Sequence, residues 1–177
     1  MEATQTVPTT TPEGCTGKAE PQKEHAWLHR MVGTWACEGE AAMEPGKPAM
    51  KWKSTETVRS LGGLWVVGEG VGEMPGGGGE AITVITLGYD PAKGRFVGTF
   101  VGSMMSNMWV YEGQLDQDER VLTLNTEGPS MTPGAPPAKY KDVVELKSED
   151  HRTLTSLVQG EDGQWHQIVS AVYQRIK

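Results

Sequence analysis

The sequence is poor in cysteine, on which several protein classes depend. Of its 177 residues only Cys15 and Cys37 are cysteine. Two cysteines are too few for a disulfide framework, and no Cys-x-x-Cys or Cys/His spacing gives a metal-binding motif. We interpret both side chains as free thiols, which predicts a reducing, cytoplasmic location.

Positive charge and long apolar runs are also scarce. The chain has 16 basic and 23 acidic residues, and its net charge is −7. This balance argues against a surface for nucleic acid or for an anionic membrane, because both need clustered Lys and Arg. No apolar run approaches the ~20 residues of a membrane span, and the N-terminus lacks the charged and apolar regions of a signal peptide. We therefore expect neither a nucleic-acid nor a membrane partner.

Glycine, proline and tryptophan are abundant instead. The sequence holds 23 Gly and 11 Pro but only 37% hydrophobic residues, which favours many turns over a helical bundle. It also holds six Trp against two Phe. Because each indole combines a large apolar area with one N–H that needs a partner, this balance is typical of a partly polar interior.

Composition divides the chain into a tail and one domain. Residues 1–21 are rich in Thr, Pro and Gly and have no periodicity, so we predict a disordered tail. A short amphipathic stretch with helical spacing follows and ends at Gly33. From Thr34 onward the apolar period becomes two, and residues 22–177 are predicted to form a single β domain.

About ten short strands with short turns between them are predicted in this domain. Links of hairpin length at even spacing favour an up-and-down antiparallel barrel over a sandwich. Ten strands also enclose a cavity more readily than the filled cores of eight-stranded barrels. The predicted strands cover residues 34–41, 49–60, 64–73, 81–89, 95–102, 105–114, 121–126, 140–146, 152–158 and 165–175.

Gly33-Thr34-Trp35 closes the amphipathic stretch and opens the first predicted strand. A short helix, a Gly-x-Trp and consecutive antiparallel strands resemble the calycins, the superfamily of lipocalins and fatty-acid-binding proteins. In that pattern the Trp lies at the closed end of the barrel and an Arg of the last strand packs across its ring. Arg175 stands in the matching place. The resemblance therefore implies that Gly33, Trp35 and Arg175 close a calycin-like barrel.

A closer resemblance is to a bacterial family, the domain-of-unknown-function 1579 proteins. It extends over residues 24–176 and implies a calycin-like barrel with no assigned activity. A more remote likeness is to nitrobindin-type barrels, which hold haem through a histidine that has no clear counterpart here. The matching stretches for the closer family are 25–28, 32–35, 58–70, 87–91, 96–99, 102–105 and 109–113.

Aromatic, methionine and polar side chains in the predicted strands are candidates for holding a ligand. Glu56 shares a strand face with Trp52, and Glu69 is in phase with Trp65. A carboxylate that points inward would be paired with a cation or would have a raised pKa, unless that end of the barrel is wet. Asp142 is a third such residue. The candidate ligand-binding residues are Trp52, Glu56, Trp65, Glu69, Met105, Asn107, Trp109, Tyr140 and Gln167.

Two points of phase and spacing limit these candidates. The alternating glycines of residues 64–73 leave open which face of that strand looks inward. The histidines do not cluster: His25 and His29 are four apart with no evident carboxylate partner for a shared metal, and His166 is out of phase with Arg175 and is expected outside. We therefore expect no metal site and no cofactor.

Three functions remain open on these grounds. The favoured one is a small-molecule binding protein that holds a largely apolar ligand in the barrel cavity. An enzyme or haem protein could use the same cavity through an inward carboxylate or histidine. A filled barrel would instead be a scaffold or interaction module. The oligomeric state stays open, with a homodimer as one alternative.

Overall fold

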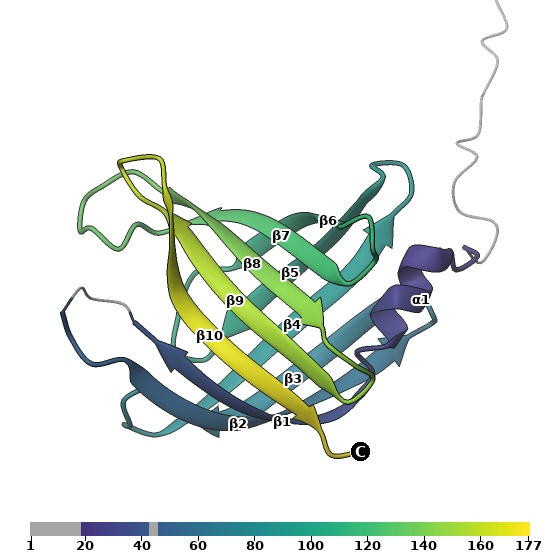
Figure 1. Ribbon diagram of the computed structural model, residues 1–177, viewed down its shortest axis with the longest axis horizontal. Helices are drawn as coiled ribbons and strands as arrows, with labels where there is room; N and C mark the ends of the chain where they lie inside the picture. The colour runs from purple at the N-terminus through teal and green to yellow at the C-terminus, as the bar shows by residue number, and fades with distance from the viewer. Residues whose placement is uncertain (1–18, 43–45) are drawn as a thin grey trace, which may run out of the picture.

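The computed structural model describes residues 19–42 and 46–177, which form one short helix and ten strands. Each strand pairs antiparallel with its neighbours along the chain, and β1 also pairs with β10, so the sheet closes into a barrel (Figure 1). The predicted ten-stranded up-and-down barrel is confirmed. The elements are α1 (Lys23–His29), β1 (Gly33–Ala41), β2 (Met50–Leu61), β3 (Trp65–Glu73), β4 (Glu80–Asp90), β5 (Arg95–Gly102), β6 (Trp109–Leu115), β7 (Val121–Gly128), β8 (Ala138–Leu146), β9 (His151–Gln159) and β10 (Trp165–Arg175).

The two ends of the barrel differ. Helix α1 lies across one end, which we call the closed end (Figure 1). Short turns join the strands there, at residues 62–64, 91–94, 116–120 and 147–150. Most of the connections at the opposite end, which we call the open end, are longer. They cover residues 74–79, 103–108, 129–137 and 160–164, and β1 ends and β2 begins at this end as well.

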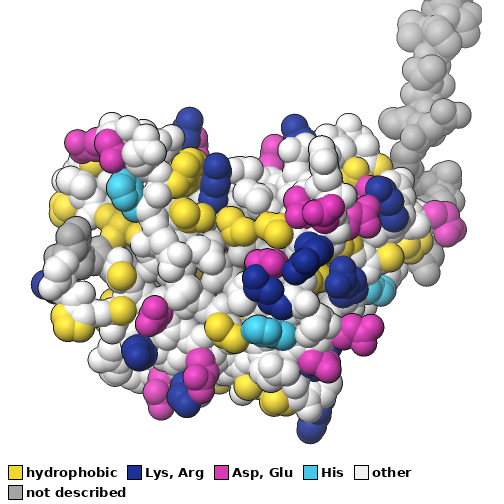
Figure 2. All heavy atoms as spheres, viewed as in Figure 1, with side chains coloured by type: hydrophobic (Ala, Val, Ile, Leu, Met, Phe, Trp, Pro, Cys, Tyr) yellow, Lys and Arg dark blue, Asp and Glu magenta, His cyan; other side chains and the backbone are white. Residues whose placement is uncertain are grey.

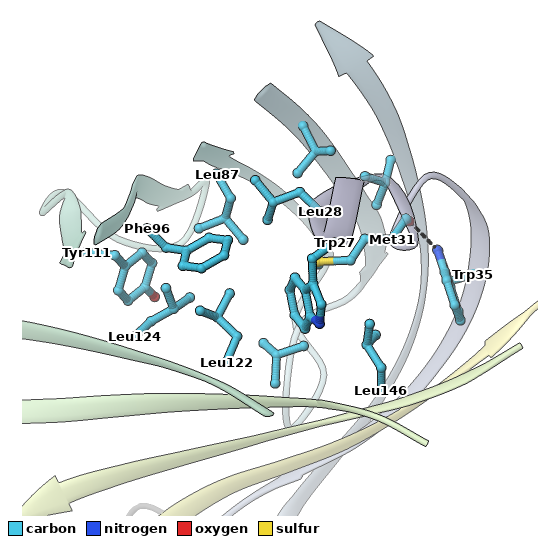
Figure 3. Packing of buried hydrophobic residues seen from close by; sticks show 13 residues of the cluster. Trp27, Leu28, Met31, Trp35, Leu87, Phe96, Tyr111, Leu122, Leu124 and Leu146 are labelled. Carbon is cyan, nitrogen blue, oxygen red and sulfur yellow. Dashed lines mark hydrogen bonds between the residues drawn. The ribbon is translucent and has the colours of Figure 1, made fainter. Parts of the chain in front are cut away.

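The hydrophobic core lies against α1 at the closed end. Trp27, Leu28 and Met31 come from the helix and the turn after it, where helical spacing places them on one side (Figure 3). Trp27 meets Phe96 of β5 edge-on, with ring centroids 6.0 Å apart. Trp35 then ties β1 to this layer, because its indole N–H donates to the Met31 carbonyl at 2.8 Å. The helical segment thus forms a plug for the barrel.

The pairing register shows which face of each strand looks inward. Trp35 pairs with Glu56 of β2, and Glu56 pairs with Gly70 of β3. Because directly paired residues share a sheet face, the alternating glycines of β3 face the interior. A Cβ at Gly68 would lie 3.2 Å from the Glu56 Oε1 atom and 2.9 Å from Ile85. The missing side chain therefore leaves room for inward groups of β2 and β4.

The sequence prediction differs from the structure most in β6 and β10. Residues 105–108, predicted as strand, belong to the loop before β6, where the Met105 N–H closes a turn by donating to the Gly102 carbonyl. In β10 the pairing with β9 shifts between Gln167 and Val169, a β-bulge that reverses the inward and outward phase. Alternation alone does not reveal a bulge.

Part of the predicted tail lies outside the described residues. This holds for residues 1–18, including Cys15, whereas residues 19–21 are described and form no helix or strand. In the described part of the chain, no helix has the length and apolar character that crossing a membrane requires.

Candidate ligand-binding site

The inner wall changes character between the two ends of the barrel. Toward the closed end, Trp35, Leu87 and Leu122 are completely buried, each with 0% of its surface exposed. Phe100, near the open end, and Leu154, near the middle of β9, also face the interior but stay only partly buried. Because these side chains point inward, the solvent that reaches them lies inside the barrel. The open half therefore has an accessible interior.

Two tryptophans line this accessible part by lying flat on glycines. A Cβ at Gly39 would come within 2.2 Å of the Trp52 ring, and one at Gly128 within 2.2 Å of the Trp109 ring. Each glycine thus makes the space that its cross-strand neighbour's indole occupies. Tyr140 meets Trp109 edge-on, with the ring centroids 4.9 Å apart. These aromatic rings form the wall near the open end.

A buried ion pair lies deeper in the interior. The Arg152 guanidinium donates to the Glu56 carboxylate, and the two side chains are only 5% and 14% exposed. The same guanidinium lies 4.1 Å from the Tyr173 ring centroid and 4.8 Å from that of Trp35. Burial lowers the pKa of Arg152. Its Nε atom is buried without a hydrogen-bond partner.

A second interior carboxylate, Asp142, has hydroxyl partners. The Tyr111 hydroxyl donates to Asp142 Oδ2 at 2.5 Å. Burial raises the pKa of Asp142, although hydrogen bonds with Ser156 and Tyr111 counteract this effect. Burial and the neighbouring carboxylate also raise the pKa of Tyr111. The pair therefore favours a protonated Tyr111 that donates to Asp142.

Cys37 and Tyr173 form a third buried polar group on the inner wall. The two residues are partners in the β1–β10 register, and their side chains are hydrogen-bonded to each other. Burial is the main cause that raises the pKa of the Cys37 thiol and of the Tyr173 hydroxyl. Both groups are thus held in their protonated forms, in which a thiol is a poor nucleophile.

The residues predicted to close the barrel lie together. The Arg175 guanidinium is 4.1 Å from the centroid of the Trp35 ring. Gly33 adopts φ +139°, and a Cβ there would come within 2.3 Å of Arg175 Nη1. This arrangement leaves no room for a side chain at Gly33.

Several candidate residues lie at the accessible interior. Trp52 and Glu56 of β2, Trp109 of β6 and Tyr140 of β8 belong to the inner face by register. Met105 and Asn107 lie in the loop before β6. The Met105 sulfur accepts a hydrogen bond from the Trp109 indole at 3.2 Å, and the Asn107 amide nitrogen is buried without a partner.

Three other candidates lie on the outer face. Trp65 is 38% exposed and covers Gly88 of the neighbouring strand, and Glu69 is exposed on the same face of β3. Trp65 and Glu69 face outward because the glycines of β3 take the inner positions. Gln167 pairs with the outward Leu157. Counting alternate residues back from Arg175 places Gln167 inside, but the bulge reverses this alternation. The interior site is therefore built without these three residues.

The sequence reasoning missed Arg152 and Thr126. Both lie on the inner face, and both are buried with a polar atom that has no partner. Alternation could have identified Arg152, because it lies on the same strand face as the apolar residues Leu154 and Val158 of β9. An inward carboxylate at Glu56 also required a cation somewhere inside the barrel.

The histidines are held in separate places. His25 accepts a hydrogen bond from the Gln22 N–H at 2.8 Å, and His29 pairs with Ser60. The bulge brings His166 to the inner-face register opposite Val158, and its exposed ring contacts Asp162 in the loop before β10. Among residues 19–42 and 46–177 no three His, Cys, Asp or Glu side chains gather as metal ligands.

The outer wall of the barrel is mixed in character. Over the face formed by β8, β9 and β10, charged side chains of both signs are interspersed with hydrophobic ones (Figure 2). The partly exposed Lys147–Glu145 ion pair lies on the outer wall. In contrast to this outer ion pair, the Glu56–Arg152 ion pair and the Asp142–Tyr111 hydrogen bond lie inside the barrel.

Comparison with known proteins gives a family and a fold. The family model described as "Protein of unknown function (DUF1579)" matches residues 20–175, so the chain belongs to that family. The crystal structure of Rv2717c from M. tuberculosis is similar, with a TM-score of 0.58 and 12% identity over 89% of this chain and 100% of the other. At that identity the likeness shows a shared fold. No protein of curated function matches this chain.

Two further solved barrels are less similar. The structure of EF1p2_mFAP2b bound to DFHBI has a TM-score of 0.41 and 11% identity, over 85% of this chain and 98% of the other. The redesigned β-barrel b11L5F_LGL has a TM-score of 0.36 and 11% identity, over 86% and 95%. Both likenesses are too low to bear on the site.

Proposed function

We propose that this member of the DUF1579 family is a binding protein, which holds a small, largely apolar molecule in the open half of its barrel. The observation that carries the proposal is the change along the inner wall. Inward side chains are fully buried beside α1, whereas inward Phe100 and Leu154 remain partly accessible. A concave, apolar wall with a few inward polar groups is the usual form of a small-molecule site.

The wall offers separate places for the body and the polar end of such a molecule. Trp52, Trp109 and Tyr140 present ring surface near the open end. Burying the apolar surface of a ligand there gains about 25 cal/mol for each Å² removed from water. The Glu56–Arg152 pair and Asp142 lie deeper and give the ligand polar groups to orient against.

The geometry gives less support to covalent catalysis. Cys37 and Tyr173 place a thiol and a phenol on the inner wall, and burial raises the pKa of both. Asp142 already accepts a hydrogen bond from Tyr111. These groups are held in a stable network, which suits recognition of a ligand better than attack on one.

Titration with the neutral fluorophore N-phenyl-1-naphthylamine tests the proposal. We expect saturable binding with enhanced emission, because the probe moves from water to an apolar wall. Leu154→Trp should fill the interior and abolish this binding, whereas Thr155→Trp is the matched control. Thr155 lies next to Leu154 but on the outer face, paired with Ser170 and Val143.

The melting temperatures of the two variants complete this test. An accessible interior has room for the extra volume, so Leu154→Trp should melt close to the wild type. In a filled core the same substitution would cost about 1–3 kcal/mol through overpacking. No saturable probe binding by the wild type, together with a strongly destabilised Leu154→Trp, would show a filled scaffold and reject the proposal.

A further inference from the structure

We infer that the inner wall formed by β6, β7 and β8 is a subsite for a protonated amine carried by the ligand. The inference rests on the proposed function and names the chemical class of the molecule that binds. Three features of this wall support it: an interior carboxylate without a cation, an unpartnered buried hydroxyl and a pair of aromatic rings toward the open end.

The interior charges do not balance among the described residues. Glu56 and Asp142 are the carboxylates on the inner faces of the strands, and Arg152 forms an ion pair with Glu56. At the closed end, Arg175 donates to the carbonyls of Arg30 and Glu149 and pairs with Asp150 at 3.2 Å. Asp142 is left with hydroxyl partners only. A cationic ligand would supply the missing charge.

Thr126 provides the independent observation. It is 8% exposed, and its Oγ1 atom is buried without a hydrogen-bond partner. The register places Thr126 directly opposite Tyr140 of β8, next to Leu124, which pairs with Asp142. Thr126 and Asp142 are therefore diagonal neighbours, which lie about 7–8 Å apart in a sheet, so an ammonium placed between them can reach both side chains. Its N–H groups would then donate to the Asp142 carboxylate and the Thr126 hydroxyl.

The aromatic rings explain the orientation of the ligand. Tyr140 and Asp142 are alternate residues of β8 and therefore lie on the same face, about 6.6 Å apart along the strand. The Tyr140 ring packs against Trp109 at 4.9 Å, on the open-end side of Asp142. Aromatic faces attract cations and apolar groups alike. The amine thus points inward to Asp142 and the apolar body lies along the aromatic rings.

An amine fits this wall better than an acid does. A ligand carboxylate would meet two interior carboxylates, while the Arg152 guanidinium is already held by Glu56. Burial without a cation also raises the pKa of Asp142, so a bound ammonium would favour its ionised form. Hydrogen bonds between charged partners are stronger than neutral ones, which favours an amine over an alcohol of the same shape.

Isothermal titration calorimetry at pH 7 with two probes of one shape tests the inference. The probes are 1-naphthylmethylamine, which is protonated at this pH, and 1-naphthylmethanol, which is neutral. We expect the wild type to bind the amine at least about tenfold more tightly, which corresponds to ~1.4 kcal/mol. Asp142→Asn should abolish this preference while binding of the alcohol persists.

Glu145→Gln is the matched control. Glu145 lies on the outer face of the same strand, so its substitution removes the same charge but should leave the preference intact. If Asp142→Asn does not fold, Thr126→Val provides the second variant and should reduce the preference severalfold, because one acceptor is lost.

The outcomes separate this inference from the proposed function. Equal binding of both probes by the wild type would overturn the amine subsite and leave the binding function standing. A preference that survives in Asp142→Asn, or that disappears in Glu145→Gln, would also overturn it. If neither probe binds, both the subsite and the proposed function fail.

Discussion

Trp35 and Arg175 are direct partners in the β1–β10 register, and the Arg175 guanidinium lies 4.1 Å from the centroid of the Trp35 ring. Arg175 also donates to the carbonyls of Arg30 and Val32, which follow α1. One residue of the last strand therefore joins the first strand to the segment that plugs the closed end. Cation–π contacts of this kind contribute about 0.5–2 kcal/mol, and the hydrogen bonds add to them.

Gly33→Ala should destabilise the protein by about 3 kcal/mol, because the new methyl would meet Arg175 Nη1 at a backbone angle that disfavours a side chain. Gly163→Ala is the matched control. Gly163 has φ +76° with no atom within 4 Å of the added Cβ, so only the backbone cost of ~1 kcal/mol applies. Urea denaturation measures both; equal losses would show that Arg175 does not restrict position 33.

Arg152→Met should lower the free energy of unfolding by about 3 kcal/mol, since it leaves the Glu56 carboxylate buried without its cation. Adding Glu56→Gln in the same chain should recover most of this loss, because the unpaired charge disappears. The measurement is a double-mutant cycle by urea denaturation.

An exposed ion pair on the outer face of the same region is the control for that cycle. Lys53 and Glu38 are 2.7 Å apart on neighbouring strands, and both are solvated. Lys53→Met should therefore change the urea midpoint little. A loss as large as that of Arg152→Met would mean that burial of the interior pair is not what makes it important.

The stability of Asp142→Asn relative to the wild type should depend on pH. Burial raises the pKa of Asp142 in the fold, so the folded protein binds the proton more tightly than the unfolded chain. The wild type therefore loses stability as pH rises from the ordinary aspartate pKa through the raised one. The variant lacks this loss, and its advantage should be largest at neutral pH and fade toward pH 4.

Urea titrations of Asp142→Asn and the wild type between about pH 4 and pH 8 measure this difference. Other carboxylates titrate alike in both proteins and cancel in the comparison. A difference that stays constant over the range would contradict the burial of an ionisable Asp142 in the folded protein.

Cys37 should react slowly with a thiol reagent in the native protein. The side chain is 3% exposed, and burial raises its thiol pKa, so both access and the thiolate fraction are low. In a Cys15→Ser background, 5,5′-dithiobis(2-nitrobenzoic acid) should label Cys37 at least about 100-fold faster in urea than in buffer, because labelling requires opening. Similar rates would show that the β1–β10 wall is not closed.

Much of the fold could be predicted from the sequence because its signals are local. Alternation, glycine turns and the Gly33-Thr34-Trp35 motif indicate short strands, hairpin links and a plugged barrel. The ten-stranded fold and the family are confirmed. These features depend on neighbours along the chain, which sequence patterns report directly.

The site was harder to predict because it depends on pairing across strands. The glycine face of β3 is inward only because Glu56 pairs with Gly70, which places Trp65 outside. The bulge before Val169 likewise changes the phase of Gln167 with no signal in the alternation. The partner of Glu56 is Arg152, which is far away in the sequence and adjacent only in the closed barrel.

Crystallography with 1-bromonaphthalene tests the central claim most directly, because the anomalous signal of bromine locates the bound molecule. The account expects a bromine peak inside the open half of the barrel, beside Phe100 and between the walls that carry Trp52 and Trp109. A peak only on the outer wall, or an interior filled by side chains with no peak inside, would contradict it.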